Sequence, residues 1–459
     1  MFPATTASNV EVTVSRDDTD LARATLRRVS VRLLPLIFVL YICNYVDRTN
    51  VAIASLQMNV DLHLSASAYA FGVGIFFLGY VLFEVPSNVI LARVGARRWI
   101  ARIMISWGLV ASAMMFMRTP LHFYLLRLLL GVAEAGFFPG VVYYLSHWFP
   151  APQRARALSR FMIAIPLAAA VGSPFGASVL ELDRRLGLAG WRWLFLIEGI
   201  PSVLLGFAVL ALLTERVEEA RWLSDEQRVW LAARLRRDED ESAAPHGVSL
   251  LRVLTYPTVW LLAFPYLLMN TTTYAYAYWA PIVIRDALHS SNLTTGLLVG
   301  AIACACAAVM LGVGVSSDRS GERCLHAAAS AILCSLGYLG AALLPTPVER
   351  VIGLAFASFG LCVLVPFWCL PSMLLRGTAA AAGIALVNSI GNLGGVVGPY
   401  VIGFSKDRLG GTTGAFLALA SVAVVEATFF FAIRRHAAFA VRGRLSTPTI
   451  KTVGVGASA

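Results

Sequence analysis

Long runs of apolar residues alternate with short polar segments along most of this chain. Each run holds about twenty residues, the length that an α-helix needs to cross about 30 Å of hydrocarbon. Because every backbone amide in lipid must find its hydrogen bond locally, the runs are predicted to be helices. The sequence lacks the ten-residue alternating segments typical of a membrane β-barrel. We expect twelve spans, at about residues 33–56, 68–91, 99–117, 121–143, 158–180, 191–213, 257–284, 293–315, 325–344, 350–374, 380–404 and 412–433.

A charged stretch at residues 214–256 divides these spans into six and six. Apolar residues recur at helical spacing inside it, namely Trp222, Leu223, Trp230, Leu231 and Leu235. This pattern predicts an amphipathic cytoplasmic helix that lies against the membrane surface, followed by a flexible segment. The expected parts are a tail at 1–32, a bundle at 33–213, the linker at 214–256, a second bundle at 257–433 and a tail at 434–459.

The two bundles carry matching landmarks. The segment Arg93-Val94-Gly95-Ala96-Arg97 follows the second span, and Arg319-Ser320-Gly321-Glu322-Arg323 follows the eighth, 226 residues later. The same offset carries Gly172 onto Gly398. A duplicated six-helix unit predicts two pseudo-symmetric bundles around a central cavity at mid-membrane, where transporters bind solute.

Composition and charge agree with a membrane protein. The chain is 58% hydrophobic and only 14% charged, too little charge to cover a soluble protein of 459 residues. Its net charge of +11 is concentrated in the tails and in the second and fourth connections, whereas the first connection, 57–67, has no basic residue. This asymmetry predicts cytoplasmic termini and argues against a nucleic-acid partner. We further expect a multi-pass monomer in the plasma membrane, surrounded by lipid.

No motif of enzyme chemistry is present in the sequence. We find no nucleophile elbow, phosphate loop or histidine-rich metal cluster. The seven cysteines lie in or beside spans, where they are expected to pack as small apolar residues. The sequence therefore predicts neither an enzyme, nor a metal site, nor a cofactor.

Charged residues inside two predicted spans require an explanation, because each is unfavourable in lipid by several kcal/mol. Asp47 and Arg48 stand in a polar island of the first span, where Tyr41, Tyr45 and Arg48 share one helical face. The fourth span contains Arg127 and Glu134, seven residues apart on one stripe. Gly131 lies between them and lets another helix or a ligand approach closely.

Two interpretations of these charges are open. In the first, Asp47–Arg48 and Arg127–Glu134 are cross-helix ion pairs that only hold the bundle together. In the second, which we favour because a permanent buried pair rarely stabilises more than an apolar pair, the arginines bind a substrate carboxylate and the acids carry protons. Arg127→Ala is then expected to abolish binding, and Glu134→Gln to retain exchange while losing proton-driven accumulation.

The C-terminal half supplies neutral polar groups in place of charges. By the repeat offset Asp47 corresponds to Thr273 and Glu134 to Gly360, so these two charges have no counterpart at the equivalent positions of the C-terminal half. The residues expected to form a hydrogen-bonding and stacking wall are Asn270, Tyr274, Tyr278, Trp279, Trp368, Asn388 and Asn392. Three further acids near predicted helix ends, Glu84, Glu198 and Asp407, are interpreted as structural.

From residue 30 to about 435 the chain resembles the major facilitator superfamily, specifically its anion:cation symporter family. The resemblance rests on Tyr45-Val46-Asp47-Arg48-Thr49-Asn50, Arg127 through Gly131 to Glu134-Ala135, Gly190-Trp191-Arg192-Trp193-Leu194-Phe195 with Glu198-Gly199, and the run Gly383 to Gly395. It implies proton-coupled uptake of an organic carboxylate by alternating access, driven by the proton gradient without a cofactor. Asp47 and Glu134 would bind protons, Arg48 and Arg127 would contact substrate, and Tyr45 and Tyr80 would line the cavity.

The resemblance also implies a gate built from the duplicated inter-span motif. Its expected residues are Arg93, Arg97, Asp318, Arg319 and Arg323. The N-terminal copy has Ala92 where the superfamily has an aspartate, so this side of the gate is expected to differ. Gly172-Ser173-Pro174 only partly matches the Gly-Pro pattern of exchangers, which favours symport.

Other functions on the same fold stay open. The chain could exchange or export organic anions or drugs, or act as a sensor that does not transport. Relatives suggested by the resemblance carry tartrate, sugar acids, phthalate or hydroxyphenylacetate, and the sequence does not choose among these substrates.

Overall fold

The protein is helical throughout the residues that the computed structural model describes, which are 16–150, 153–154, 164–242, 255–374 and 378–445. The first half contains α1 (Arg16–Asp61), α2 (Ala66–Val94), α3 (Ala96–Ala113), η1 (Met114–Phe116), α4 (Pro120–Glu134), α5 (Phe137–Ser146), α7 (Ala164–Leu180), η2 (Arg185–Gly187), α8 (Gly190–Leu212), η3 (Val217–Glu219) and α9 (Asp225–Ser242). The second half contains α11 (Pro257–Leu288), α12 (Asn292–Ser320), α13 (Cys324–Leu343), α14 (Pro347–Ala357), η4 (Ser358–Val363), α15 (Leu364–Phe367), α16 (Cys369–Leu374), α17 (Thr378–Asn392), α18 (Gly394–Arg408) and α19 (Thr413–Leu445).

Ten helices in the described part of the chain are long and apolar enough to cross a membrane. Two predicted spans are not among the ten. The helix α7 is described over 17 residues only, because residues 155–163 lie outside the described ones. The helix α11 has 32 residues, but Asn270 and the three threonines that follow it make its middle polar. A polytopic membrane protein is therefore established, and the count of twelve depends on these two helices.

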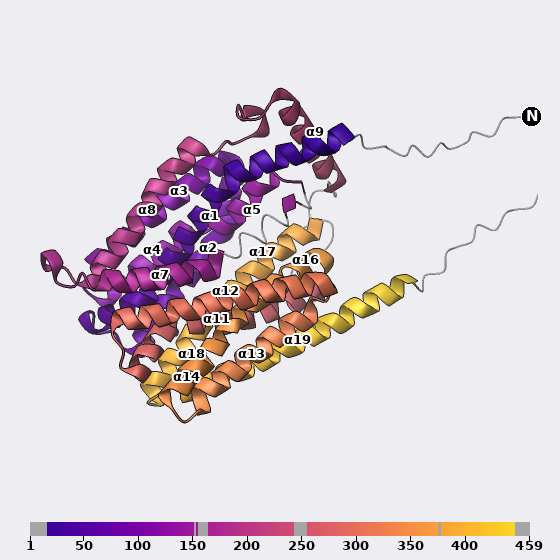
Figure 1. Ribbon diagram of the computed structural model, residues 1–459. Helices are drawn as coiled ribbons and strands as arrows, with labels where there is room; N and C mark the ends of the chain where they lie inside the picture. Colours follow the sequence, from indigo (N-terminus) through magenta and orange to yellow (C-terminus); the bar gives the residue numbers. More distant parts are fainter. Residues whose placement is uncertain (1–15, 151–152, 155–163, 243–254, 375–377, 446–459) are drawn as a thin grey trace, which may run out of the picture.

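The helices form two groups that lie side by side, the indigo-to-magenta group and the orange-to-yellow group of Figure 1. Within the first group α3 packs on α8 and α2 on α4, and within the second α13 packs on α14 and α19. Between the groups the main contacts are α7 with α12 and α2 with α18. The start of α1 and the end of α19 lie on the same side of the molecule.

The structure supports the duplication inferred from the sequence. The helix α2 runs from Ala66 to Val94 and α12 from Asn292 to Ser320, so both ends of α12 lie 226 residues after those of α2. Each helix begins with a serine whose side chain accepts a backbone N–H, and each ends at a glycine with positive φ. Such repeated capping is expected when one structural unit occurs twice in a chain.

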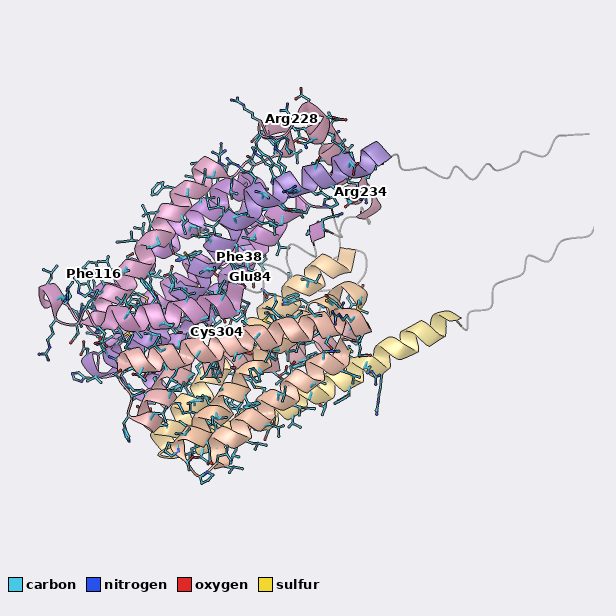
Figure 2. All side chains as sticks on the ribbon, viewed as in Figure 1. Phe38, Glu84, Phe116, Arg228, Arg234 and Cys304 are labelled. Carbon is cyan, nitrogen blue, oxygen red and sulfur yellow. The ribbon has the colours of Figure 1, made fainter. Side chains whose placement is uncertain are left out.

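The linker helix α9 is present as predicted from its apolar spacing, and its apolar stripe packs on the protein. Its leucines Leu231 and Leu235 are buried and α9 contacts α1. The Trp222 ring before it stacks on Trp148 with ring centres 5.4 Å apart. Arg228 and Arg234, labelled in Figure 2, are half-buried at the edges of this apolar face, and the outward face carries Arg236 and Arg237. The apolar stripe of α9 is covered because α1 extends beyond the bundle and offers a matching surface.

The fourth predicted span is broken directly after Glu134. Gly136 has φ +86°, a left-handed conformation that favours glycine, and it separates α4 from α5. One helical turn before Glu134, α4 passes very close to α2. A Cβ atom added at Gly131 would lie 2.0 Å from the carbonyl oxygen of Phe76. The close approach expected at Gly131 is therefore present, and it brings Glu134 against α1 and α2.

We predict that Gly131→Ala lowers the melting temperature of the purified protein. The added methyl group would collide with a backbone carbonyl, so α2 and α4 must separate, and overpacking of this kind destabilises by about 1–3 kcal/mol. The matched control is Gly312→Ala in α12, where a Cβ atom meets nothing within 4 Å. Equal melting temperatures for both variants in a thermal unfolding assay would contradict the tight helix contact.

The two helix groups are joined at the end of the molecule away from the chain termini. The carboxylate of Asp407, at the end of α18, accepts hydrogen bonds from the backbone amides of Ala66 (3.2 Å) and Ser67 (2.7 Å) at the start of α2. A carboxylate at a helix N-terminus is favourable because the first amides there have no partner in the helix. Arg285 of α11 also donates to the carbonyl of Leu56 in α1. Asp407, interpreted from the sequence as structural, thus closes this end across the two halves.

Candidate functional site

The polar island of the first span lies within an unbroken helix, α1, so its side chains point in different directions. Arg48 points to the centre of the molecule, where it is only 9% exposed. Its Nε donates to Glu134 Oε1 at 2.8 Å and its Nη2 donates to the same oxygen. Its Nη1 lies 3.5 Å from the hydroxyl of Tyr274 in the second half. The buried ion pair is therefore Arg48–Glu134, and it lies beside the boundary between the halves.

A cavity of about 590 Å³ opens next to this pair. Its walls come from both halves and carry mainly aromatic and neutral polar side chains. The residues that line it are Tyr41, Tyr45, Arg48, Tyr80, Phe138, Ile165, Tyr266, Met269, Asn270, Thr273, Tyr274, Leu361, Leu364, Trp368, Asn388 and Asn392. Arg48 is the one charged side chain in this lining among the described residues. A cavity with aromatic walls and few fixed polar groups suits a small organic solute.

Most of the residues predicted to bind substrate lie in this lining. They are Tyr45, Arg48, Tyr80, Asn270, Tyr274, Trp368, Asn388 and Asn392. The aromatic rings also hold Arg48 in position, since its guanidinium lies 5.2 Å from the ring centre of Tyr80 and 5.6 Å from that of Phe76. Cation–π contacts of this kind stabilise a charge that has left water.

Arg127 and Trp279, also predicted to bind substrate, lie outside the cavity lining. The guanidinium of Arg127 lies against the ring of Phe76, 4.7 Å from the ring centre, and its Nε is 3.4 Å from the carbonyl of Gly72. Its two terminal nitrogens make no hydrogen bond of good geometry to the described residues. Trp279 donates from its ring nitrogen to the carbonyl of Pro399 (3.0 Å), within the second half.

The two acids predicted to bind protons occupy different environments. Glu134 is fully buried. Its Oε1 accepts both hydrogen bonds from Arg48, and its Oε2 has no hydrogen-bond partner in the described structure. Asp47 points into the first half, where its Oδ2 accepts hydrogen bonds from Trp107 (2.7 Å) and Ser202 (2.5 Å). Asp47 does not line the cavity. Of the two acids, only Glu134 contacts a residue of the cavity wall by an ion pair.

Glu84 lies at the boundary of the halves, although the sequence suggested a structural residue near a helix end. Figure 2 places its label between the two helix groups. Its carboxylate accepts hydrogen bonds from Asn388 (2.6 Å) and Ser389 (2.8 Å) of α17. It stands one turn of α2 beyond Tyr80, well inside a helix of 29 residues. The predicted span, 68–91, is shorter than α2, so Glu84 was taken to lie near a helix end. An acid in the middle of a longer apolar helix would have indicated a contact inside the protein.

The predicted gate residues form contacts within their own halves. The Arg97 side chain donates to the carbonyl of Leu210 at 2.5 Å, and Arg323 pairs with Asp318 at 2.6 Å. Arg93 and Arg319 are exposed. The backbone amides of Ala96 and Arg97 donate to Glu215, at 2.7 and 3.0 Å. The sequence analysis did not identify Glu215, an acid close in space to α3 but distant in the chain.

No group of three or more His, Cys, Asp or Glu side chains that could hold a metal ion occurs among the described residues. The seven cysteines are not joined by disulfide bonds in the described structure. The chemistry available in the cavity is therefore that of one arginine, its buried glutamate, and neutral amide and phenol groups.

Two helical halves around a central polar cavity define a membrane transporter of the secondary active kind. The chain belongs to the Major Facilitator Superfamily, whose family model matches residues 37–399. It is a transporter and not an enzyme. It is 42% identical over 422 residues to a protein of Agrobacterium vitis named "Putative tartrate transporter", covering 92% of this chain and 97% of that one.

A second relative is the "Quinolone resistance transporter" of Acinetobacter baumannii, 38% identical over 392 residues, or 85% of this chain and 90% of the relative. Among solved structures, the chain is similar to a bacterial homologue of the human lysosomal transporter Spinster, with a TM-score of 0.70 and 16% identity. That likeness covers 88% of this chain and 96% of the other, and it supports the fold alone.

Proposed function

We propose that this chain imports an organic carboxylate together with a proton, as a member of the anion:cation symporter family. The observation that carries the proposal is the position of Arg48, a buried cation in the wall of a cavity between two transporter halves. A planar guanidinium binds a carboxylate through two parallel hydrogen bonds. The relative named for tartrate supports the same substrate class.

Coupling to a proton follows from competition for Arg48. While Glu134 is ionised, its carboxylate pairs with the Arg48 guanidinium. A substrate carboxylate would then place two anions beside one cation, which is unfavourable. When Glu134 takes up a proton, it leaves Arg48 available, and the substrate carboxylate replaces it. Anion and proton are then bound at the same time, and the site carries no excess charge. After both leave, the Arg48–Glu134 pair forms again and the empty carrier can return.

The second half of the cavity suits a hydroxylated acid. The amides of Asn270, Asn388 and Asn392 and the phenols of Tyr266 and Tyr274 face the cavity from that side. They supply donors and acceptors without charge, which match hydroxyl groups. Since Arg48 is the one arginine in the lining among the described residues, one carboxylate is held by charge and the rest of the molecule by hydrogen bonds and aromatic contact.

We further propose twelve spans in two bundles at 33–213 and 257–433, with both termini in the cytoplasm and the protein in the plasma membrane. The support is the excess of arginine on the side of the termini. In this orientation Asp407 and Arg285 join the two halves on the outer side of the cavity. Labelling of single cysteines placed in the loop at 62–65 and in the N-terminal tail, from outside intact cells, tests the orientation.

The function is tested by thermal-shift screening of the purified protein against monocarboxylates, dicarboxylates and hydroxy acids, with tartrate among them. We expect the best ligand to raise the melting temperature and to accumulate in proteoliposomes when the interior is more alkaline. Accumulation that does not depend on the pH gradient would contradict proton coupling. If none of the carboxylates raises the melting temperature, the proposed substrate class is contradicted.

Drug export is the second candidate function, and the relative named for quinolone resistance favours it. The aromatic lining of the cavity, with Tyr41, Phe138 and Trp368, would accept a planar ring. Export predicts stabilisation of the purified protein by quinolones and lower drug accumulation in cells that express it. The fall in drug accumulation separates the two functions, because import of a carboxylate does not predict it, whereas a carboxylate site could also bind the carboxyl group of a quinolone.

We propose Arg127 as a second substrate contact that Phe76 screens in the described conformation. A buried cation whose terminal nitrogens lack good hydrogen bonds provides donors for an arriving anion. Because Arg127 lies behind the cavity wall, Arg127→Ala is expected to weaken carboxylate binding by about tenfold, or about 1.4 kcal/mol. Calorimetry on the purified variant measures the carboxylate affinity. The control is Trp279→Phe, because Trp279 was also predicted to bind substrate but lies outside the cavity lining. Unchanged affinity in the Arg127 variant would restrict Arg127 to a structural role.

A further inference from the structure

A second chamber lies against the substrate cavity. Its volume is about 850 Å³, and its walls come from α1, α7 and α8 of the first half and from α11, α12 and η4 of the second. Four residues line both chambers, namely Tyr45, Ile165, Thr273 and Leu361. A change in one chamber can therefore reach the other through a single layer of side chains.

Glu198 is the one carboxyl group in the lining of this second chamber among the described residues. It stands in the middle of α8, not near a helix end as the sequence suggested, and it is 6% exposed. Both of its oxygens lack a hydrogen-bond partner in the described structure. The amide of Asn50 lies beside it, and a Cβ atom at Gly176 of α7 would lie 3.5 Å from Glu198 Oε1.

The groups that face Glu198 supply no positive charge. From α1 they include Asp47 and the Cys43 thiol, and the chamber wall adds Tyr45 from α1, Tyr276 from α11 and Cys306 from α12. None of the described lining residues is an arginine or a lysine, and α3 and α7 bring no charged side chain to this carboxyl.

Two neighbouring carboxyl groups without a cation cannot both be ionised in a site of low dielectric. Asp47 receives hydrogen bonds from Trp107 and Ser202, which favour its ionised form. Glu198 receives none of good geometry. This arrangement favours a single proton on the pair, bound to the Glu198 carboxyl, which no donor of good geometry stabilises as an anion.

We propose that Glu198 is a second proton-binding site of the transport cycle, reached through the chamber between the halves. The site deepens the proposed function, on which its coupling role rests. In one state of the carrier the Glu198 carboxylate takes a proton from water, and in the other it returns the proton to water as α11 and α12 move away. Asp47 acts as the positioning acid that keeps the proton on Glu198. Two protons, one on Glu134 and one on Glu198, then move with each substrate anion.

Infrared spectroscopy of the full-length purified protein tests the site without any substrate. We expect the carboxylic-acid C=O band of the wild type to contain a component that disappears as the pH rises and is missing in Glu198→Gln. The matched control is Glu426→Gln in α19, another buried acid whose oxygens lack partners but which lines neither chamber. This control should keep the pH-dependent component. If Glu198→Gln keeps it, the proposal is overturned. Glu198→Asp keeps a titratable carboxyl group and should shift the pH at which the infrared component is half lost. This variant replaces the glutamine variant if the latter does not fold.

Uptake of labelled tartrate in proteoliposomes tests coupling. At zero membrane potential and a pH difference of one unit, two protons sustain about 100-fold accumulation and one proton about tenfold. We expect Glu198→Gln to lower the wild-type ratio about tenfold while tartrate exchange continues, and Glu426→Gln to match the wild type. An unchanged ratio in Glu198→Gln overturns the coupling role, and accumulation driven by a sodium gradient overturns the proton assignment. If the wild type accumulates neither tartrate nor any other screened carboxylate, the proposed function is contradicted instead, and the infrared result still decides whether Glu198 binds a proton.

Discussion

Arg48→Ala is expected to abolish carboxylate binding and transport. The substitution removes the one charged donor found in the described cavity lining, and charge-assisted hydrogen bonds of this kind contribute about 3 kcal/mol, or about a hundredfold in affinity. Binding is measured by calorimetry and thermal shift, and transport by uptake into proteoliposomes. The variant Arg48→Lys should restore only part of the affinity, because an ammonium lacks the planar fork.

Loss of Arg48 also leaves Glu134 buried without its partner, so stability and binding must be separated. Breaking a buried pair destabilises by about 3–5 kcal/mol. The double variant Arg48→Ala with Glu134→Gln removes both charges and is expected to recover the melting temperature without recovering binding. Should the double variant bind carboxylates with wild-type affinity, Arg48 is not the substrate contact.

Glu134→Gln is expected to uncouple transport from the proton that Glu134 carries. A glutamine mimics the protonated acid in shape, so Arg48 stays available for substrate at every pH. Exchange of labelled for unlabelled substrate should continue, and binding should lose its preference for low pH. Accumulation in proteoliposomes should fall about tenfold for a pH difference of one unit, the amount that one proton sustains.

Matched measurements separate loss of coupling from loss of activity. Exchange at wild-type rates shows that the variant still changes conformation, and Glu426→Gln again controls for removal of a buried acid that does not line the cavity. Wild-type accumulation by Glu134→Gln would exclude Glu134 from the coupling role and leave the proton to other acids.

The described conformation also suggests how the two sides of the cavity are closed in turn. Asp407 joins the halves at one end by accepting hydrogen bonds from the first amides of α2, and Glu84 joins them nearer the other end through Asn388 and Ser389. Asn388 belongs to the cavity lining, so a substrate that binds there competes with Glu84. Substrate binding can therefore loosen one contact between the halves.

The sequence alone was sufficient for the membrane class, the repeat and most of the cavity wall. Hydrophobic length marks spans because lipid demands helices about twenty residues long. The offset between the two copies of the inter-span motif matches the two ends of α2 and α12. Asn270, Asn388 and Trp368 were expected at a central wall because polar and aromatic groups in a span need a cavity, and they line one.

Only the tertiary structure decided which charges meet. The pair that forms is Arg48–Glu134, across α1 and α4, and Asp47 instead turns to Trp107 and Ser202 although it is the neighbour of Arg48 in sequence. Adjacent residues on a helix point about 100° apart, so partners are set by helix packing and not by order in the chain. The same reason kept Glu84, Glu198 and Asp407 from being placed by sequence: each acts through contacts with helices that are distant in the chain and neighbouring only in the folded protein.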